Sequence, residues 1–159
     1  MVQKILLLGD ARLYEQSVPV ERKELPALKQ AVVDLHDTLL DYRRTYGMGR
    51  AIAAPQIGVF KRLIYLYIDE PIVFINPVLT ILDEEKVRIR DDCMSFPNLL
   101  VDVWRYKAVR LDYRDLEFED CSITFADDLA ELLQHEYDHL DGILATMRAI
   151  DPYAFHYKQ

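Results

Sequence analysis

The segment LLQHEYDHLDG, residues 132–142, constrains the fold most, because it places two histidines at helical spacing. Residues four apart lie on one face of an α-helix, so His135 and His139 can direct their ring nitrogens at one point. Several leucines make the same segment apolar: Leu129, Leu132, Leu133 and Leu140. We therefore expect a helix whose histidine face points at least partly into the protein.

A divalent metal would give these two imidazoles a common partner. Zinc bonds histidine nitrogen at about 2.0–2.1 Å, within reach of both side chains. Glu136 directly follows the first histidine, where it can act as a base on a water held by the metal without being a ligand. The alternative is a charged helix face that matches a short pattern by chance. The apolar context favours the metal site, because buried imidazoles need partners.

The third ligand separates the possible classes of enzyme. Extended metalloprotease motifs continue to a third histidine after a glycine, but here Gly142 is followed by Ala145 at that position. No glutamate follows Glu136, and His156 in the C-terminal segment stays a possible ligand. The upstream candidate is Cys93, whose thiolate and two histidines would leave one position open for water. The alternative for this cysteine is a small buried apolar side chain.

The rest of the chain predicts one more helix and several strands. Apolar residues at helical spacing indicate a helix over residues 26–45, closed by Gly47 and Gly49. Runs of β-branched and aromatic residues predict strands at residues 62–68, 72–82 and 86–90. An antiparallel pair follows at residues 106–115 and 117–126, with a turn near residues 115–116.

The last helix is expected over residues 127–140, with Asp127 or Thr124 as its cap and Gly142 at its end. This order predicts an α+β fold, with mostly antiparallel sheets packed around a central C-terminal helix that carries the HExxH motif. No repeat or Gly/Ser linker divides the chain, so residues 1–159 are expected to form a single domain.

Charge and cysteine content exclude some partners. The 159-residue chain has a formal net charge of −8, which argues against direct nucleic-acid readout, because such binding depends on neutralising phosphates. Its two cysteines do not indicate an oxidising compartment. The N-terminal apolar run is too short for a signal peptide or a membrane span, so we expect a cytoplasmic protein without a membrane partner.

Three segments in order resemble the peptide deformylase family: GRAIAAPQIG at 49–58, DDCMSFP at 91–97 and QHEYDHLDG at 134–142. The opening KILLLGDARLYEQSVPV is similar to the N-terminal strand and loop of that family, and INPVL precedes the cysteine as expected. The resemblance implies hydrolysis of the formyl group on the N-terminal formylmethionine of new proteins. It also implies one divalent metal, ferrous iron in the cell and zinc, nickel or cobalt in preparations.

The resemblance assigns roles to individual residues. Cys93, His135 and His139 would be the metal ligands. Glu136 would take a proton from the attacking water and deliver it to the leaving amine. The side-chain amide of Gln56 and the backbone N–H of Met94 would stabilise the oxyanion. The partner would be an N-formylated peptide or nascent chain, with a weak contact to the ribosome.

Several positions that would face the substrate depart from the family pattern. Arg50 and Ala51 follow Gly49 where the family has an apolar residue and a second glycine, and a methyl group there would narrow the groove. Asp92 replaces the glycine before the cysteine and adds a charge beside the metal. Asp91 replaces a glutamate, with Arg105 as its expected partner.

Two further departures concern the side-chain pocket. Glu131 stands one turn before His135, where the family has an apolar residue, and its neighbour Leu132 is expected to contact substrate as well. Leu100 stands where many members carry an arginine near the substrate entrance. The sequence leaves two alternatives to a formylmethionine deformylase: an amidase with altered substrate specificity, and a non-catalytic peptide-binding descendant.

Overall fold

Two helices and an antiparallel sheet of six strands make up the structure, a computed structural model that describes residues 1–159. The strands run in the order β1-β2-β3-β4-β5, with β6 beside β4. The strands are β1 (Ala51–Ala53), β2 (Leu63–Tyr67), β3 (Pro71–Cys93), β4 (Phe96–Arg114), β5 (Asp120–Ala126) and β6 (Phe155–Tyr157). The helices are α1 (Leu25–Tyr46) and α2 (Asp127–Leu140), with 3-10 turns at Ala11–Tyr14, Arg22–Glu24, Ala54–Ile57 and Ala145–Arg148. The predicted α+β class is confirmed.

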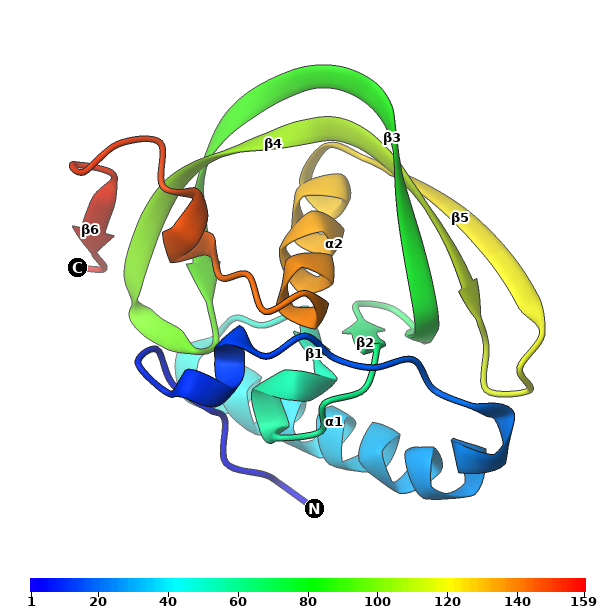
Figure 1. Ribbon diagram of the computed structural model, residues 1–159. Helices are drawn as coiled ribbons and strands as arrows, with labels where there is room; N and C mark the ends of the chain where they lie inside the picture. The colour runs from blue at the N-terminus through cyan, green and yellow to red at the C-terminus, as the bar shows by residue number, and fades with distance from the viewer.

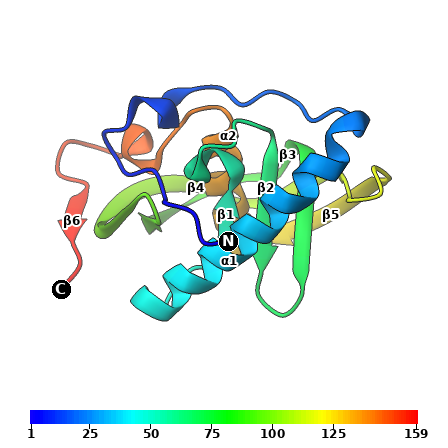
Figure 2. The ribbon, with the colours of Figure 1, turned by 90° about the horizontal axis from the view of Figure 1, so that it is seen from below.

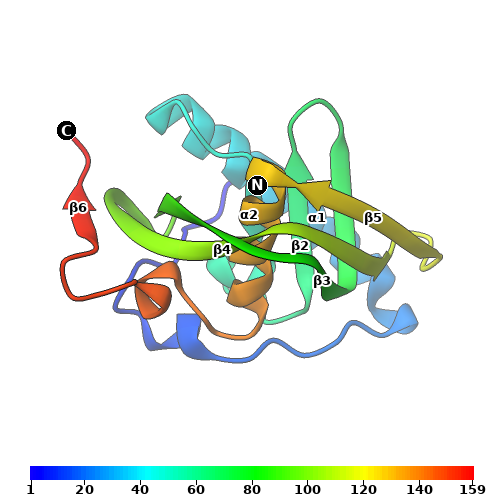
Figure 3. The same cartoon turned by 90° about the horizontal axis from the view of Figure 1, so that it is seen from above.

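Helix α2 lies at the centre of the molecule. The long strands β3 and β4 cross over it, while β1 and β2 lie on its other side (Figures 1 and 3). Its Leu133 and Leu140 are fully buried against Ile64, Phe74 and Leu111 of the sheet. Burying one such side chain contributes about 1.5–3 kcal/mol, so this packing holds the histidine-bearing helix firmly inside the sheet.

Helix α1 covers the outer side of the β1–β2 region (Figure 2). Its Leu35 and Leu39 are fully buried and pack with Ile52 and Leu63. The helix ends at Gly47, whose φ of 70° is the left-handed conformation that glycine adopts without strain. The predicted helix over residues 26–45 is therefore confirmed. Neither helix of the fold is both long and apolar enough to cross a membrane.

The strand predictions were too fragmented. Residues 72–82 and 86–90 belong to one strand, β3, in which register shifts near Asp83 accommodate the exposed acidic stretch. Strand β4 starts at Phe96 rather than at residue 106, and the short β1 was not predicted. The turn expected near residues 115–116 is present, with the Phe118 N–H donating to the Asp115 carbonyl at 2.9 Å.

Two local predictions were wrong: the residue that caps α2 and the presence of an N-terminal strand. Ala126 is the N-cap of α2 and makes no side-chain capping bond, while Asp127 is the first helical residue and Thr124 lies within β5. The N-terminal segment forms no strand, although hydrogen bonds fix it in place. The N–H of Leu6 donates to the Gln56 carbonyl and that of Leu8 to the Ser95 carbonyl, both at 2.8 Å.

Candidate metal centre and active site

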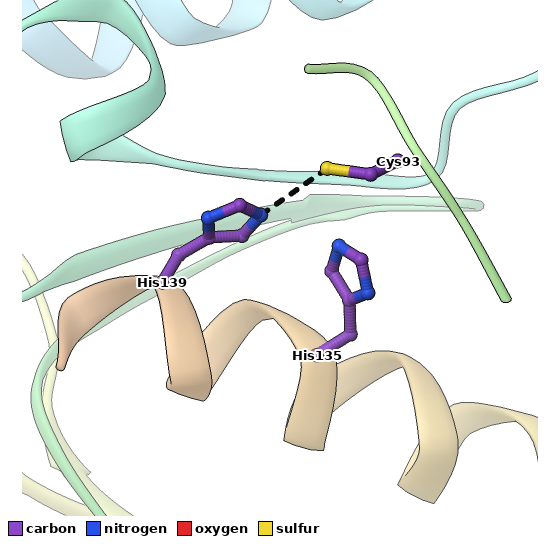
Figure 4. Close-up of side chains that lie close together, drawn as sticks. All are labelled: Cys93, His135 and His139. Carbon is purple, nitrogen blue, oxygen red and sulfur yellow. Dashed lines mark hydrogen bonds between the residues drawn. The ribbon is translucent and has the colours of Figure 1, made fainter. Parts of the chain in front are cut away.

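Three side chains from two distant elements meet beside α2. Cys93 ends β3, and His135 and His139 project from consecutive turns of α2 toward its sulfur (Figure 4). One ligand atom from each lies within 4.8 Å of the others, and Cys93 Sγ is 3.3 Å from His139 Nε2. The three residues are only 6%, 4% and 1% exposed. The structure thus brings together the three residues that the sequence predicted as metal ligands.

Asp91 and Arg105 hold the first histidine in position. His135 Nδ1 donates to Asp91 Oδ2 at 2.8 Å, which leaves the other ring nitrogen free to face the cysteine. Arg105 donates to the same carboxylate at 3.0 Å, as predicted, and to Asp138 at 2.8 Å. Burial alone would raise the pKa of Asp91, but the charges of His135 and Arg105 outweigh it and lower that pKa to about 2.

The second histidine has an environment that suits a neutral metal ligand. Burial and the neighbouring His135 hold the pKa of His139 well below its usual range, which keeps its ring neutral and able to coordinate. Its Nδ1 is buried without a hydrogen-bond partner. One thiolate and two imidazoles form a ligand set that suits iron, zinc, cobalt or nickel, and their spacing is close to that set by bonds of about 2.0–2.3 Å. The residues therefore fit one metal ion.

Glu136 lies beside this group and has an unsatisfied oxygen. It is 4% exposed, and its Oε2 has no hydrogen-bond partner. Burial raises its pKa to about 7, although the neighbouring His135 opposes this. A carboxyl group with such a pKa can both accept and return a proton near neutral pH.

Gln56 approaches the group from the 3-10 turn Ala54–Ile57. Its side chain is buried, its Oε1 accepts from the Ala53 N–H at 3.0 Å, and its Nε2 donates to Ser95 Oγ at 3.1 Å. The same nitrogen lies 3.7 Å from Cys93 Sγ. Ser95 was not singled out from the sequence, although it stands in the DDCMSFP motif, and its N–H also donates to the cysteine sulfur at 3.4 Å. Gln56 is therefore fixed with its amide next to the candidate ligand.

A cavity of about 410 Å³ opens beside the cluster. All six residues predicted to contact substrate line it: Gly49, Arg50, Ala51, Asp92, Glu131 and Leu132. Cys93, Met94, His135 and Glu136 line it as well, whereas Gln56 and His139 are not among the lining residues. Sequence reasoning missed further lining residues, among them Tyr42, Met48, Ile89 and Arg90, because they come from elements whose proximity only the fold reveals.

Three charged side chains of the cavity have partners of opposite charge. Arg50 pairs with Asp128 at 2.8 Å, and Arg90 pairs with Asp102 at 2.9 Å. Asp92 pairs with Lys158 of the C-terminal segment at 3.2 Å. The ion pairs of Arg50 and Asp92 explain how charged residues are accommodated at two positions where the family pattern has an apolar residue or glycine.

Two other sequence candidates lie away from the centre. Leu100 pairs with His156 between β4 and β6 and does not line the cavity. His156 Nε2 lies 3.1 Å from Asp102 Oδ2 and does not belong to the three-residue ligand group. The C-terminal histidine is therefore not the third ligand.

A buried Cys-His-His group with an adjacent carboxyl group, held on a central helix inside an antiparallel sheet, defines a metal-dependent hydrolase. The family model for polypeptide deformylase matches residues 2–154. The chain is 40% identical over 144 residues to the peptide deformylase of Pseudothermotoga lettingae, covering 91% of this chain and 81% of that protein. It is 35% identical to the enzyme of Pelotomaculum thermopropionicum, covering 93% and 92% of the two chains.

Solved structures of peptide deformylases have a fold similar to that of this chain. The peptide deformylase of Thermotoga maritima superposes with a TM-score of 0.85 at 28% identity, covering 95% of this chain and 99% of that one. The peptide deformylase of Synechococcus elongatus, solved in complex with actinonin, gives a TM-score of 0.86 at 28% identity, covering 94% and 80%. The chain belongs to the peptide deformylase family. It is an enzyme that removes the N-terminal formyl group from formylmethionyl peptides, and its Cys-His-His group points to a single catalytic metal.

Proposed function

We propose that Cys93, His135 and His139 hold one ferrous ion in the cell, and that Glu136 and Gln56 promote hydrolysis of the formyl amide. Zinc, nickel or cobalt would replace iron in preparations, because the donor set suits all four. The observation that carries the proposal is the buried, unpartnered carboxyl oxygen of Glu136, which lines the same cavity as two of the three candidate ligands.

The bound metal supplies a Lewis acid that activates water and polarises the formyl oxygen. Glu136 accepts the proton that the water loses as it attacks the formyl carbon, and then delivers that proton to the departing amine. The Gln56 amide and the Met94 N–H donate hydrogen bonds to the oxygen that gains negative charge. Burial of these groups keeps bulk water away, which strengthens each of these interactions.

The peptide would bind along the free edge of β1. This strand pairs only with β2, so its other edge is open next to the cavity, where Gly49, Arg50 and Ala51 lie. An extended peptide can add to such an edge through main-chain hydrogen bonds. Asp92, Glu131 and Leu132 then face the side chains of the peptide from the opposite walls of the cavity.

We assign the catalytic unit to one domain of residues 1–159 that acts in the cytoplasm on formylated nascent chains, with a weak contact to the ribosome. The three ligands, the base and the cavity come from segments between residues 42 and 139, and the core that holds them includes residues from Leu6 to Ala154. This distribution of site and core residues supports the proposal of a single domain.

Formate release by the metal-loaded protein tests the proposal. Protein loaded anaerobically with iron or nickel is expected to release formate from formyl-Met-Ala, and removal of the metal by a chelator is expected to abolish this. His135→Ala should lose both metal and activity, whereas His36→Ala, a histidine outside the ligand group, should keep both. Formate release by metal-free protein, or none by loaded protein, would refute the proposal.

A further inference from the structure

Apart from the proposed base Glu136, Glu131 is the one carboxylate lining the cavity that has neither an ion-pair partner nor a side-chain hydrogen bond. The three aspartates of the wall have partners: Asp92 has Lys158, Asp128 has Arg50, and Asp91 has Arg105. No ion pair or side-chain hydrogen bond engages Glu131, which is half-buried on α2 one turn before His135. The cavity therefore holds one negative charge that the protein itself does not neutralise, besides the proposed base.

The environment of Glu131 makes this unpaired charge costly. Burial raises the pKa of Glu131, and the nearby carboxylates of Asp128 and Asp91 raise it further, while Arg50 opposes them. A charge removed from water is unfavourable unless it gains a partner. A positively charged group of the ligand would supply that partner at the wall of the cavity.

The remaining wall suits a long side chain with a charged end. Tyr42, Met48, Ile89 and Leu132 provide apolar surface in the same cavity. The methylene stem of lysine or arginine packs against such surface while its charged end reaches a polar group. The same surface also accommodates the unbranched side chain of methionine, which carries no charge.

We propose that Glu131 is a specificity-determining residue that favours N-formyl peptides with a lysine or arginine at the first or second position. This inference rests on the proposed function, because it concerns the cavity in which the formyl group is hydrolysed. Charge-assisted hydrogen bonds are about twice as strong as neutral ones, so we expect roughly a tenfold higher kcat/KM for the cationic peptide.

The wild-type enzyme tests the charge preference without any mutation. The kcat/KM for formate release is measured with formyl-Met-Lys, formyl-Met-(acetyl-lysine), formyl-Met-Ala and formyl-Lys-Ala. We expect formyl-Met-Lys or formyl-Lys-Ala to exceed formyl-Met-Ala roughly tenfold, which assigns the position, and acetylation to remove the gain at the second position. Equal kcat/KM for all four peptides would overturn the inference and leave the proposed function intact, whereas no formate from any peptide would refute the proposed function.

The variant Glu131→Gln tests whether this residue is responsible. It keeps the size of the side chain and removes its charge, so the cationic-to-neutral ratio of kcat/KM should fall toward one. Glu84→Gln, an exposed glutamate of β3 outside the cavity, should keep the wild-type ratio. A ratio that survives Glu131→Gln would overturn the assignment to Glu131. If that variant fails to fold, the wild-type comparison of cationic with neutral peptides still tests the charge preference, and equal kcat/KM values there would overturn the inference.

Discussion

Asp91 Oδ2 accepts a hydrogen bond from His135 Nδ1 at 2.8 Å and thereby fixes the ring that faces Cys93. The same oxygen also accepts from Arg105, whose other terminal nitrogen donates to Asp138. The candidate metal ligand is thus connected to a buried chain of charges that crosses from β3 through β4 to α2. Carboxylate partners of this kind orient a ligating histidine and increase its basicity.

Replacing Asp91 by alanine is expected to weaken metal binding. Loss of a carboxylate that supports a ligating histidine typically lowers metal affinity roughly ten- to a hundredfold. Competition with a chelator, at matched protein folding by circular dichroism, measures this change. Asp69→Ala removes an exposed carboxylate outside the site and should leave the affinity unaltered. Wild-type affinity in Asp91→Ala would show that the ring is oriented by other contacts.

Replacing Gln56 by leucine is expected to lower kcat more than it raises KM. An oxyanion donor acts in the transition state, and removal of one typically costs about 10²–10³ in kcat. Steady-state formate release, together with metal analysis, checks this result. Gln16→Leu changes an exposed glutamine and should behave as wild type. A variant with unchanged kcat would remove Gln56 from the proposed mechanism.

The hydrogen bonds that Asp102 accepts predict that the folded protein loses stability in acid. It accepts from Arg90, Arg88 and His156, and the bond from Arg90 in particular holds the pKa of Asp102 well below its usual range. Because the folded-state pKa is lower than the unfolded value of about 3.9, the stabilisation is present above that value and is lost as the pH falls below it.

Urea unfolding at neutral pH and in acid measures this contribution. Asp102→Asn should be less stable than wild type at neutral pH, and the difference should shrink below about pH 4. The exposed Asp69→Asn is the control at each pH. A difference between Asp102→Asn and wild type that stays constant across the acid range would contradict the assignment.

The position of Gly142 is expected to be more sensitive to substitution than that of Gly47. Its φ is 71°, and an added Cβ would overlap the carbonyl oxygen of Tyr14. Gly47 has nearly the same φ, 70°, but open space around it. Gly47→Ala should lower the free energy of unfolding by about 1–2 kcal/mol for its backbone conformation, and Gly142→Ala by about 1–3 kcal/mol more for the overlap. Equal losses in thermal or urea unfolding would show that the Tyr14 segment moves aside at little cost.

The sequence predicted the elements with strong periodicity and missed those that depend on distant partners. Helix α2 occupies the predicted residues 127–140, because its leucines and histidines repeat at helical spacing. Residues 83–85 were predicted as a break because they are acidic, yet pairing with β4 on either side of them carries β3 through this exposed stretch. The short β1 was missed because its three residues form a strand only where β2 lies beside them.

The sequence predicted the chemical groups of the candidate site but not all of the residues that line its cavity. Cys93, His135 and His139 stand in recognisable motifs, and their side chains do converge. By contrast, no motif indicates that Lys158 reaches Asp92, because 66 residues separate them and only the fold brings β6 beside β4. The sequence likewise could not show that Glu131 lacks an ion-pair partner, because this depends on which side chains the fold brings to the cavity.

Formate release by Glu136→Gln tests the central claim most directly. The variant removes the proposed base while keeping the size of the side chain and all three ligands. With iron or nickel loaded anaerobically, it should keep one metal per chain and lose activity on formyl-Met-Ala by roughly 10²–10⁴-fold. Glu84→Gln should retain wild-type activity under the same conditions. Metal-loaded Glu136→Gln that releases formate at the wild-type rate would contradict the account.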